Sequence, residues 1–134
     1  MPNRRYRSGV NLEREIRNIL EKRYNIPCLR TAGSKSDFDL VALGRRTILI
    51  QVKYTSKKNI KASRAQIQKV KKYLTDKRWA VIIVVQRQTR LTNITWIEDN
   101  PSQLWGCYEL CTHDNMTAKF PDAMNKLYNL CTMV

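Results

Sequence analysis

The chain has 134 residues, of which 43% are hydrophobic and 27% charged, as in a soluble globular protein with one ordinary core. No apolar run approaches the roughly 18 residues of a membrane span, and the N-terminus lacks the apolar centre of a signal peptide. We therefore expect an intracellular protein with no membrane segment.

The formal net charge of +14 is unevenly distributed along the chain. Residues 1–90 hold 23 Lys and Arg against 6 Asp and Glu, whereas residues 91–134 hold 2 against 5. Such a charge indicates a polyanionic partner, most plausibly nucleic acid, bound by the first two-thirds of the chain. The DNA contacts that we expect are Arg4, Arg5, Arg7, Arg30, Lys35, Lys57, Lys58, Lys61 and Arg64.

The N-terminal region predicts an arm followed by a helix. Residues 1–7 carry three arginines and are expected to be a mobile arm, after which Ser8 can cap a helix that runs to about Tyr24. Glu13 falls at the edge of the apolar stripe of this helix. Spacing alone favours a surface glutamate paired with Arg17, one turn further on.

Residues 28–31 predict a short strand, and residues 32–36 predict a loop. The backbone N–H groups of Gly33, the hydroxyl of Ser34 and the charge of Lys35 suit a phosphate group. The more common outcome for a Gly-Ser pair is an ordinary polar turn.

The central part of the sequence predicts a β-hairpin. Residues 40–43 and 47–55 are two apolar runs on either side of a Gly-Arg-Arg turn. Asp39 opens the first strand, while Gln51 and Lys53 lie two apart on the second, so their side chains leave the same face. Polar groups beside an apolar core need partners, and metal-dependent phosphodiester hydrolysis would supply them.

The next part of the chain predicts a helix and two strands. Ser63 can cap a helix that runs to about Lys77, after a basic linker over residues 56–62. Residues 79–86 are the most apolar run and predict a central strand buried on both faces. Residues 93–98 alternate more and predict an edge strand.

The last part predicts two helices, over residues 101–110 and 121–134. We therefore expect one α/β domain over residues 1–134, with a mixed sheet of about five strands flanked by helices. Its core would span about 8–98, and 99–134 would be a C-terminal helical extension. The apolar residues of this extension suit core capping or a subunit interface, and its lack of basic charge argues against a DNA role.

The four cysteines form no CxxC pair. Cys107, Cys111 and His113 could approach a metal, but a structural zinc site needs four ligands at tighter spacing. Buried free thiols are the favoured interpretation. The alternative, for a hyperthermophile protein, is a disulfide from Cys131 to Cys107 or Cys111.

Four short segments carry a resemblance to a known family. They are Gly-Val-Asn-Leu-Glu-Arg-Glu at 9–15, Arg-Thr-Ala-Gly-Ser at 30–34, Asp-Leu-Val-Ala at 39–42 and Ile-Gln-Val-Lys at 50–53. In this order and spacing the chain resembles the archaeal Holliday junction resolvases, a branch of the PD-(D/E)XK nuclease superfamily, over roughly residues 5–85.

The resemblance implies a restriction-endonuclease-like fold and a homodimer that makes a Mg²⁺-dependent cut in each of two opposed strands of a four-way DNA junction. It gives Asp39 the place of the central metal-binding aspartate and Lys53 that of the motif lysine. Glu13 matches the helix-borne glutamate, and Ser34 matches a loop serine of the active site.

Gln51 departs from this pattern, because archaeal resolvases carry glutamate there, whereas other branches such as Mrr-like restriction nucleases carry Gln-x-Lys. An amide oxygen can take the ligand position but brings no charge. The expected metal ligands are then Asp39, Glu13 directly or through water, Gln51 and the Val52 carbonyl. We expect weaker Mg²⁺ binding, rescue by Mn²⁺, and a role for Lys53 in orienting or deprotonating the attacking water.

The sequence thus predicts a metal-dependent, structure-selective DNA endonuclease of the resolvase type. Two alternatives stay open at this point. One is a Mrr-like nuclease that cuts duplex DNA, and the other is a catalytically silent DNA-binding module.

Overall fold

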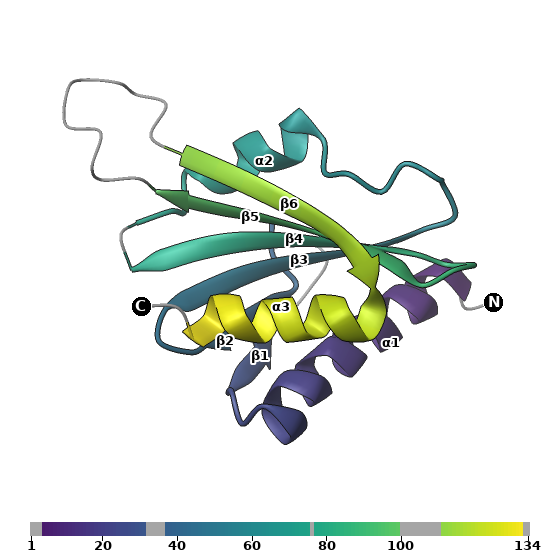
Figure 1. The fold of residues 1–134 in the computed structure, drawn as a ribbon, viewed down its shortest axis with the longest axis horizontal. Coiled ribbons are helices and arrows are strands. Elements are labelled where there is room, and N and C mark those ends of the chain that lie inside the picture. Colours follow the sequence, from purple (N-terminus) through teal and green to yellow (C-terminus); the bar gives the residue numbers. More distant parts are fainter. Residues whose placement is uncertain (1–3, 32–36, 76, 100–110, 133–134) are drawn as a thin grey trace.

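The computed structural model describes residues 4–31, 37–75, 77–99 and 111–132. In these ranges six strands form one sheet in the order β1-β2-β3-β4-β5-β6 (Figure 1). The elements in chain order are α1 (Arg4–Asn18), which continues as a π-helical turn η1 (Ile19–Arg23), β1 (Cys28–Arg30), β2 (Leu40–Leu43), β3 (Thr47–Thr55), α2 (Arg64–Lys71), β4 (Arg78–Gln86), β5 (Leu91–Asp99), β6 (Cys111–Lys119) and α3 (Phe120–Thr132).

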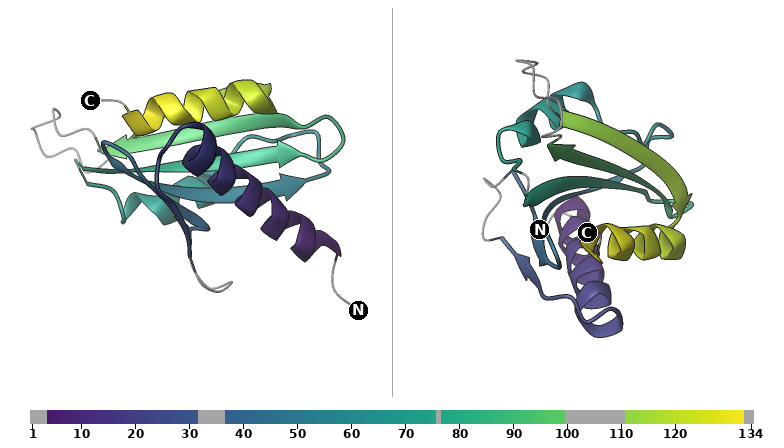
Figure 2. Two further views of the ribbon diagram at one scale, coloured as in Figure 1. Left: turned by 90° about the horizontal axis from the view of Figure 1, so that it is seen from below. Right: turned by 60° about the vertical axis from the view of Figure 1, so that its left-hand side comes forward.

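The sheet is mixed, as expected. Strands β3 and β4 are parallel and connected through α2, and every other neighbouring pair is antiparallel. Figures 1 and 2 show α1 and α3 against one face of the sheet and α2 against the other. None of the described helices is long and apolar enough to cross a membrane.

Strand β4 lies between two apolar layers, because its side chains alternate between them. Val81 and Ile83 join the layer with α1 and α3, while Ala80 and Ile82 join the layer with α2. The predicted burial of this strand on both faces is confirmed. The α1–α3 layer is the larger, and among its fully buried side chains are Leu12, Ile16, Leu20, Ile48, Ile50, Met124 and Leu127.

The hairpin of β2 and β3 forms as predicted, with Leu40 opposite Ile50 and Leu43 opposite Thr47. The N-terminal prediction needs correction. Helix α1 begins at Arg4, so residues 4–7 belong to the helix and Ser8 does not cap it. Arginine is a good helix former, and no Gly or Pro interrupts residues 4–8.

Helix α2 begins where the sequence predicts and ends earlier. The Ser63 hydroxyl accepts from the Gln66 N–H at 3.2 Å, and the Gln66 side chain accepts from the Ser63 N–H at 2.8 Å. The helix ends at Lys71 rather than near Lys77. Beyond it, the Tyr73 hydroxyl is held by a tertiary hydrogen bond, which draws the chain away from the helix axis.

The prediction that residues 99–134 form a helical extension is wrong, because residues 111–119 form strand β6. Residues 93–98 are therefore not an edge strand. Strand β6 pairs with β5 along its whole length, from Leu91 opposite Lys119 to Asp99 opposite Cys111. The segment His-Asp-Asn in β6 has turn-forming residues rather than β-branched ones, which concealed the strand. Helix α3 confirms the second predicted helix, whereas residues 101–110 lie outside the described residues.

Cys28 and Cys131 are free and buried, so the favoured interpretation is confirmed for these two thiols. Burial raises the pKa of the Cys28 thiol to about 11 and that of Cys131 to about 12, which leaves both in the unreactive thiol form. Cys107 lies outside the described residues.

Candidate functional site

Asp39 is held on three sides where β2 begins. Its N–H donates to the Ile50 carbonyl at 2.9 Å, and its own carbonyl accepts from the Thr31 N–H at 3.0 Å. The carboxylate oxygen Oδ2 accepts from the Val52 N–H at 2.8 Å. A side chain with its backbone and one oxygen fixed in this way is preorganised to bind a ligand.

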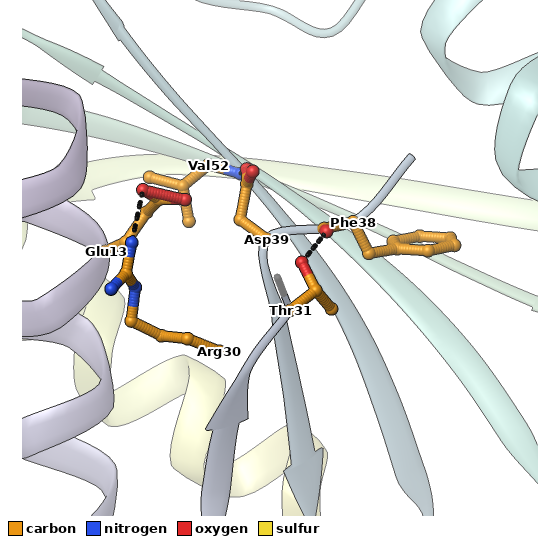
Figure 3. A network of polar contacts seen from close by, with 6 residues as sticks. All are labelled: Glu13, Arg30, Thr31, Phe38, Asp39 and Val52. Atoms are coloured by element: carbon orange, nitrogen blue, oxygen red, sulfur yellow. Dashed lines mark hydrogen bonds and ion pairs between the residues drawn. The ribbon is translucent and has the colours of Figure 1, made fainter. Parts of the chain in front are cut away.

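Glu13 comes to the same place from helix α1 (Figure 3). Its neighbour Leu12 is buried in the core, which anchors the helix and turns Glu13 toward β3. The Glu13 carboxylate lies 3.7 Å from the Arg30 guanidinium. The expected partner Arg17 instead pairs with Glu21 at 3.7 Å, so the surface interpretation of Glu13 is wrong.

The pKa of Glu13 is raised to about 7 from its usual value near 4.5. Burial is the largest cause, followed by the negative charge of Asp39 and a hydrogen bond with it, while Arg30 and Arg14 act weakly in the opposite direction. Two carboxyl groups in contact disfavour full ionisation of both. A proton or a cation between Glu13 and Asp39 would relieve this repulsion.

Gln51 and Lys53 lie on either side of Val52 in the same strand. Gln51 pairs with Ile82 of β4, which belongs to the α2 layer, whereas Val52 packs into the α1–α3 layer. The prediction that Gln51 and Lys53 share a face therefore agrees with the register. Gln51 is half-buried and Lys53 exposed, and no hydrogen bond or ion pair among the described residues joins either side chain to the two carboxylates.

The structure thus brings together Glu13, Asp39 and the backbone of Val52. Gln51 and Lys53 flank Val52 on β3, but their side chains project from the α2 face of the sheet, opposite to the face that α1 covers. Within the described ranges, no three His, Cys, Asp or Glu side chains group together to hold a metal ion. Within the described residues, any oxygen ligand beyond the two carboxylates would come from an amide, a hydroxyl, a backbone carbonyl or water.

The remaining predicted residues fall into three groups. Ser34 and Lys35 lie outside the described residues, as do the side chains of the three N-terminal arginines. The other expected DNA contacts follow the end of β3 and are exposed, namely Lys57, Lys58, Lys61 and Arg64. Arg30 is half-buried against Glu13.

The structure also distinguishes Asp37 from Asp39. The Tyr73 hydroxyl donates to Asp37 Oδ2 at 2.6 Å, and the Lys72 ammonium lies 3.8 Å from the same oxygen. Asp37 therefore ties the start of the hairpin to the end of α2, and Asp39 is the aspartate that faces Glu13. Sequence reasoning missed this tie and the Arg30–Glu13 pair, because both join residues far apart in the chain.

The model of the archaeal Holliday junction resolvase (Hjc) family matches residues 4–104, more than half of the chain. The chain belongs to this family. The predicted resolvase function and its nuclease class are thereby confirmed, and the two alternatives are not favoured. The family match covers all of the site described above, whereas β6 and α3 lie beyond the matched residues.

Among solved structures, this Hjc-family chain is similar to the 1.6 Å structure of Archaeoglobus fulgidus Hjc, a Holliday junction resolvase from an archaeal hyperthermophile. The identity is 16% and the TM-score 0.47, with 87% of this chain and 99% of that chain covered. None of the curated proteins compared with the chain matches it.

Proposed function

We propose that this Hjc-family resolvase is a divalent-cation-dependent endonuclease that works as a homodimer and cuts two opposed strands of a four-way DNA junction. Its active site would consist of Glu13, Asp39, Gln51 and Lys53, completed by Ser34. The observation that carries the proposal is the Glu13–Asp39 carboxylate pair, which is fixed against the Val52 backbone.

The side chains present suit a hard cation. Mg²⁺ and Mn²⁺ prefer oxygen ligands, and Mg²⁺ proteins commonly supply one or two carboxylates and leave the rest to water. Glu13, Asp39, the Gln51 amide oxygen and the Val52 carbonyl are all oxygen donors. The raised pKa of Glu13 is further support, because a divalent cation would replace the proton that the two carboxyl groups otherwise share.

Each residue then has a defined task. A bound cation would supply Lewis-acid stabilisation of the scissile phosphate and of the attacking water. Asp39 holds its carboxylate in place through Val52, and Glu13 adds a second negative charge once it has lost its proton. Lys53 orients the attacking water or holds a proton beside it, while its exposed position leaves it open to the DNA.

Gln51 sets the strength of cation binding in this proposal. It offers an oxygen but no charge, so the site has two formal negative charges from side chains rather than three. We expect a need for more Mg²⁺ than a three-carboxylate site would require, and better activity with Mn²⁺. The basic residues after β3 would hold the DNA backbone, and the protein would act on DNA inside the cell.

The test is a cleavage assay with four-way junction DNA and with a plain duplex of the same sequence, each in Mg²⁺ and in Mn²⁺. We expect paired nicks in opposed strands of the junction and little cutting of the duplex. Equal cutting of the two substrates, or no cutting with either ion, would contradict the proposal.

Two variants assign the site within the same assay. Asp39→Asn keeps an oxygen able to accept from the Val52 N–H but loses the charge, and Lys53→Ala removes the exposed ammonium. Each should slow cutting by at least about a hundred-fold while junction binding stays within about two-fold. Lys22→Ala, on the exposed surface of η1, is the control for loss of one positive charge.

A further inference from the structure

A basic hollow lies between α2 and the outer strands of the sheet, whose positions can be followed in Figure 1. Its volume is about 510 Å³. It is bounded by Lys61, Arg64 and Lys71 on the helix side and by Thr95, His113 and Asn115 on the strand side. We call it the α2–β6 pocket. Two of its residues belong to β6, beyond the residues that match the family.

The strand register places this pocket on the face of the sheet from which Gln51 and Lys53 project, the face opposite to α1. Gln51 pairs with Ile82, Ile82 with Thr95, and Thr95 with Asn115. Paired residues of neighbouring strands project from the same face, so one row of side chains runs from the motif strand to the edge strand. The α2 helix lies over the middle of this row and separates the pocket from Gln51 and Lys53.

The charges in the pocket are of one sign and lack counterions. None of its lining residues is acidic, and in the described part of the chain Lys61, Arg64 and Lys71 form no ion pair. The neighbouring Lys72, by contrast, pairs with Asp37. Like charges gathered in one hollow repel one another, and an anionic ligand would stabilise them.

The spacing along α2 suits an extended anion. Arg64 and Lys71 are seven residues apart, which is two turns of one helix face and about 10 Å along the axis. One strand of DNA carries a phosphate about every 3.4 Å along the duplex axis, so this distance corresponds to about three phosphate-to-phosphate steps. Gln68 lies between the two cations on the same face and adds an amide.

The opposite wall is a fixed polar surface. The Thr95 hydroxyl donates to Asn93 Oδ1 at 3.0 Å, and Asn93 Nδ2 donates to Thr117 Oγ1 at 3.0 Å, which ties β5 to β6. The side chains of His113 and Asn115 stay exposed at the rim. Amide and imidazole groups on a rigid wall commonly contact phosphate and sugar oxygens.

We propose that the α2–β6 pocket binds backbone phosphates of a DNA arm that leaves the cleavage site across α2. This inference rests on the proposed function for the identity of the DNA, but it concerns residues outside the active site. It also gives β6 a part in DNA binding, although the net charge of residues 91–134 is negative.

The experiment measures binding of four-way junction DNA by fluorescence anisotropy over a range of salt concentrations. All proteins carry Asp39→Asn, so that the substrate stays intact. The test variants are Lys71→Gln, Arg64→Gln and Asn115→Asp, which remove a positive charge from the pocket or add a negative one. Lys69→Gln on the same helix is the control for the first two. Asn125→Asp on α3, at the opposite face of the sheet, is the control for the third.

Each pocket variant should weaken junction binding by roughly three- to ten-fold. Lys71→Gln and Arg64→Gln should also reduce the salt slope by about one, because each removes about one phosphate contact. The controls should stay within about two-fold of the parent protein. The inference is overturned if the pocket variants lose no more affinity or salt slope than their controls. Circular dichroism and melting curves of all variants identify any loss that comes from misfolding.

These binding data and the cleavage assay of the wild-type protein together separate the two proposals. If the wild-type protein cuts junctions while the pocket variants bind like their controls, the pocket inference fails and the proposed function stands. If the pocket variants lose affinity but the wild-type protein cuts no junction, the pocket binds DNA and the proposed function fails.

Discussion

Asp39 shows how much of this site depends on backbone contacts rather than on side-chain type. Its N–H, its carbonyl and one carboxylate oxygen are each bound, by Ile50, Thr31 and Val52 respectively. The sequence predicted that Asp39 opens a hairpin beside Gln51 and Lys53, because that pattern is local. It did not predict the Val52 N–H as the group that fixes the carboxylate, since this bond depends on how the strands meet.

The partners of Glu13 could not be predicted from its position in the helix. Spacing within a helix predicted a partner one turn away, and only the family resemblance favoured a role in the site. The actual neighbours, Arg30 and Asp39, come from other elements. The spacing of residues within α1 cannot predict contacts with residues of other elements.

The raised pKa of Glu13 predicts how stability changes with pH. Between about pH 4.5 and about pH 7 the folded protein keeps a proton on Glu13 that the unfolded chain has released. The free energy of unfolding therefore falls as the pH rises through this window, and above it the loss is complete. Glu13→Gln should remove this contribution, so the melting temperature of the variant relative to wild type should rise from pH 4.5 to pH 7 and then level off.

The control for this prediction is Glu15→Gln, two residues away on the same helix. Glu15 pairs with Arg90 at 2.7 Å and lies outside the carboxylate pair, so its loss should give no such stabilisation at pH 7. Calorimetric melting of the three proteins across the pH range is the measurement. A difference between Glu13→Gln and wild type that does not change with pH would show that the pKa of Glu13 is not raised in the folded protein.

Among the elements, those with local signals were predicted well. The hairpin, the capped start of α2 and the buried strand β4 follow from turn residues, a capping box and an apolar run, all of which lie within a few residues of one another. Strand β6 was missed because it has few β-forming residues and gains its order from pairing with β5. The early end of α2 likewise follows from the contact between Tyr73 and Asp37.

The close packing of the turn between β2 and β3 predicts the effect of a substitution at Gly44 on stability. A Cβ on Gly44 would collide with the Cys131 carbonyl oxygen at the end of α3, while the next N–H, of Arg45, donates to that same oxygen at 2.9 Å. Gly44→Ala should therefore destabilise the protein by about 1–3 kcal/mol, because backbone must move.

Gly9→Ala is a matched substitution in open space. Nothing lies within 4 Å of a Cβ at Gly9, which is inside α1, so alanine should stabilise the helix by about 0.5–1 kcal/mol. Urea denaturation of both variants gives the two free energies. If the two variants had equal effects, the hairpin turn would not be packed against α3.

At the scale of the whole molecule, composition and charge pointed to nucleic acid, and the resemblance pointed to the fold class. The prediction of a mixed α/β fold holds, but the sheet extends through β6 and α3 packs into its larger core. This could not be predicted, because residues 111–119 show neither the strand alternation nor the charge of the rest of the protein. The α2–β6 pocket depends on that unpredicted strand.

A homodimer with one site in each subunit predicts how mixed dimers behave. Wild-type protein mixed and refolded with excess Asp39→Asn should form dimers with one competent site. Such dimers should nick one strand of a junction and lose the paired cut. Gel analysis of a junction carried on a supercoiled plasmid distinguishes nicked from linear product. If the amount of linear product were instead proportional to the number of wild-type chains, each chain would make both cuts.

In the proposed function, Glu13, Asp39 and the Gln51–Val52 segment form one divalent-cation site, and calorimetric titration with Mn²⁺ measures the binding at that site. We expect one weak site per chain in the wild-type protein, loss of that site in Asp39→Asn, and binding at least roughly ten-fold tighter in Gln51→Glu, which adds a third carboxylate. Unchanged Mn²⁺ binding in Asp39→Asn, or no gain in Gln51→Glu, would contradict the proposed site.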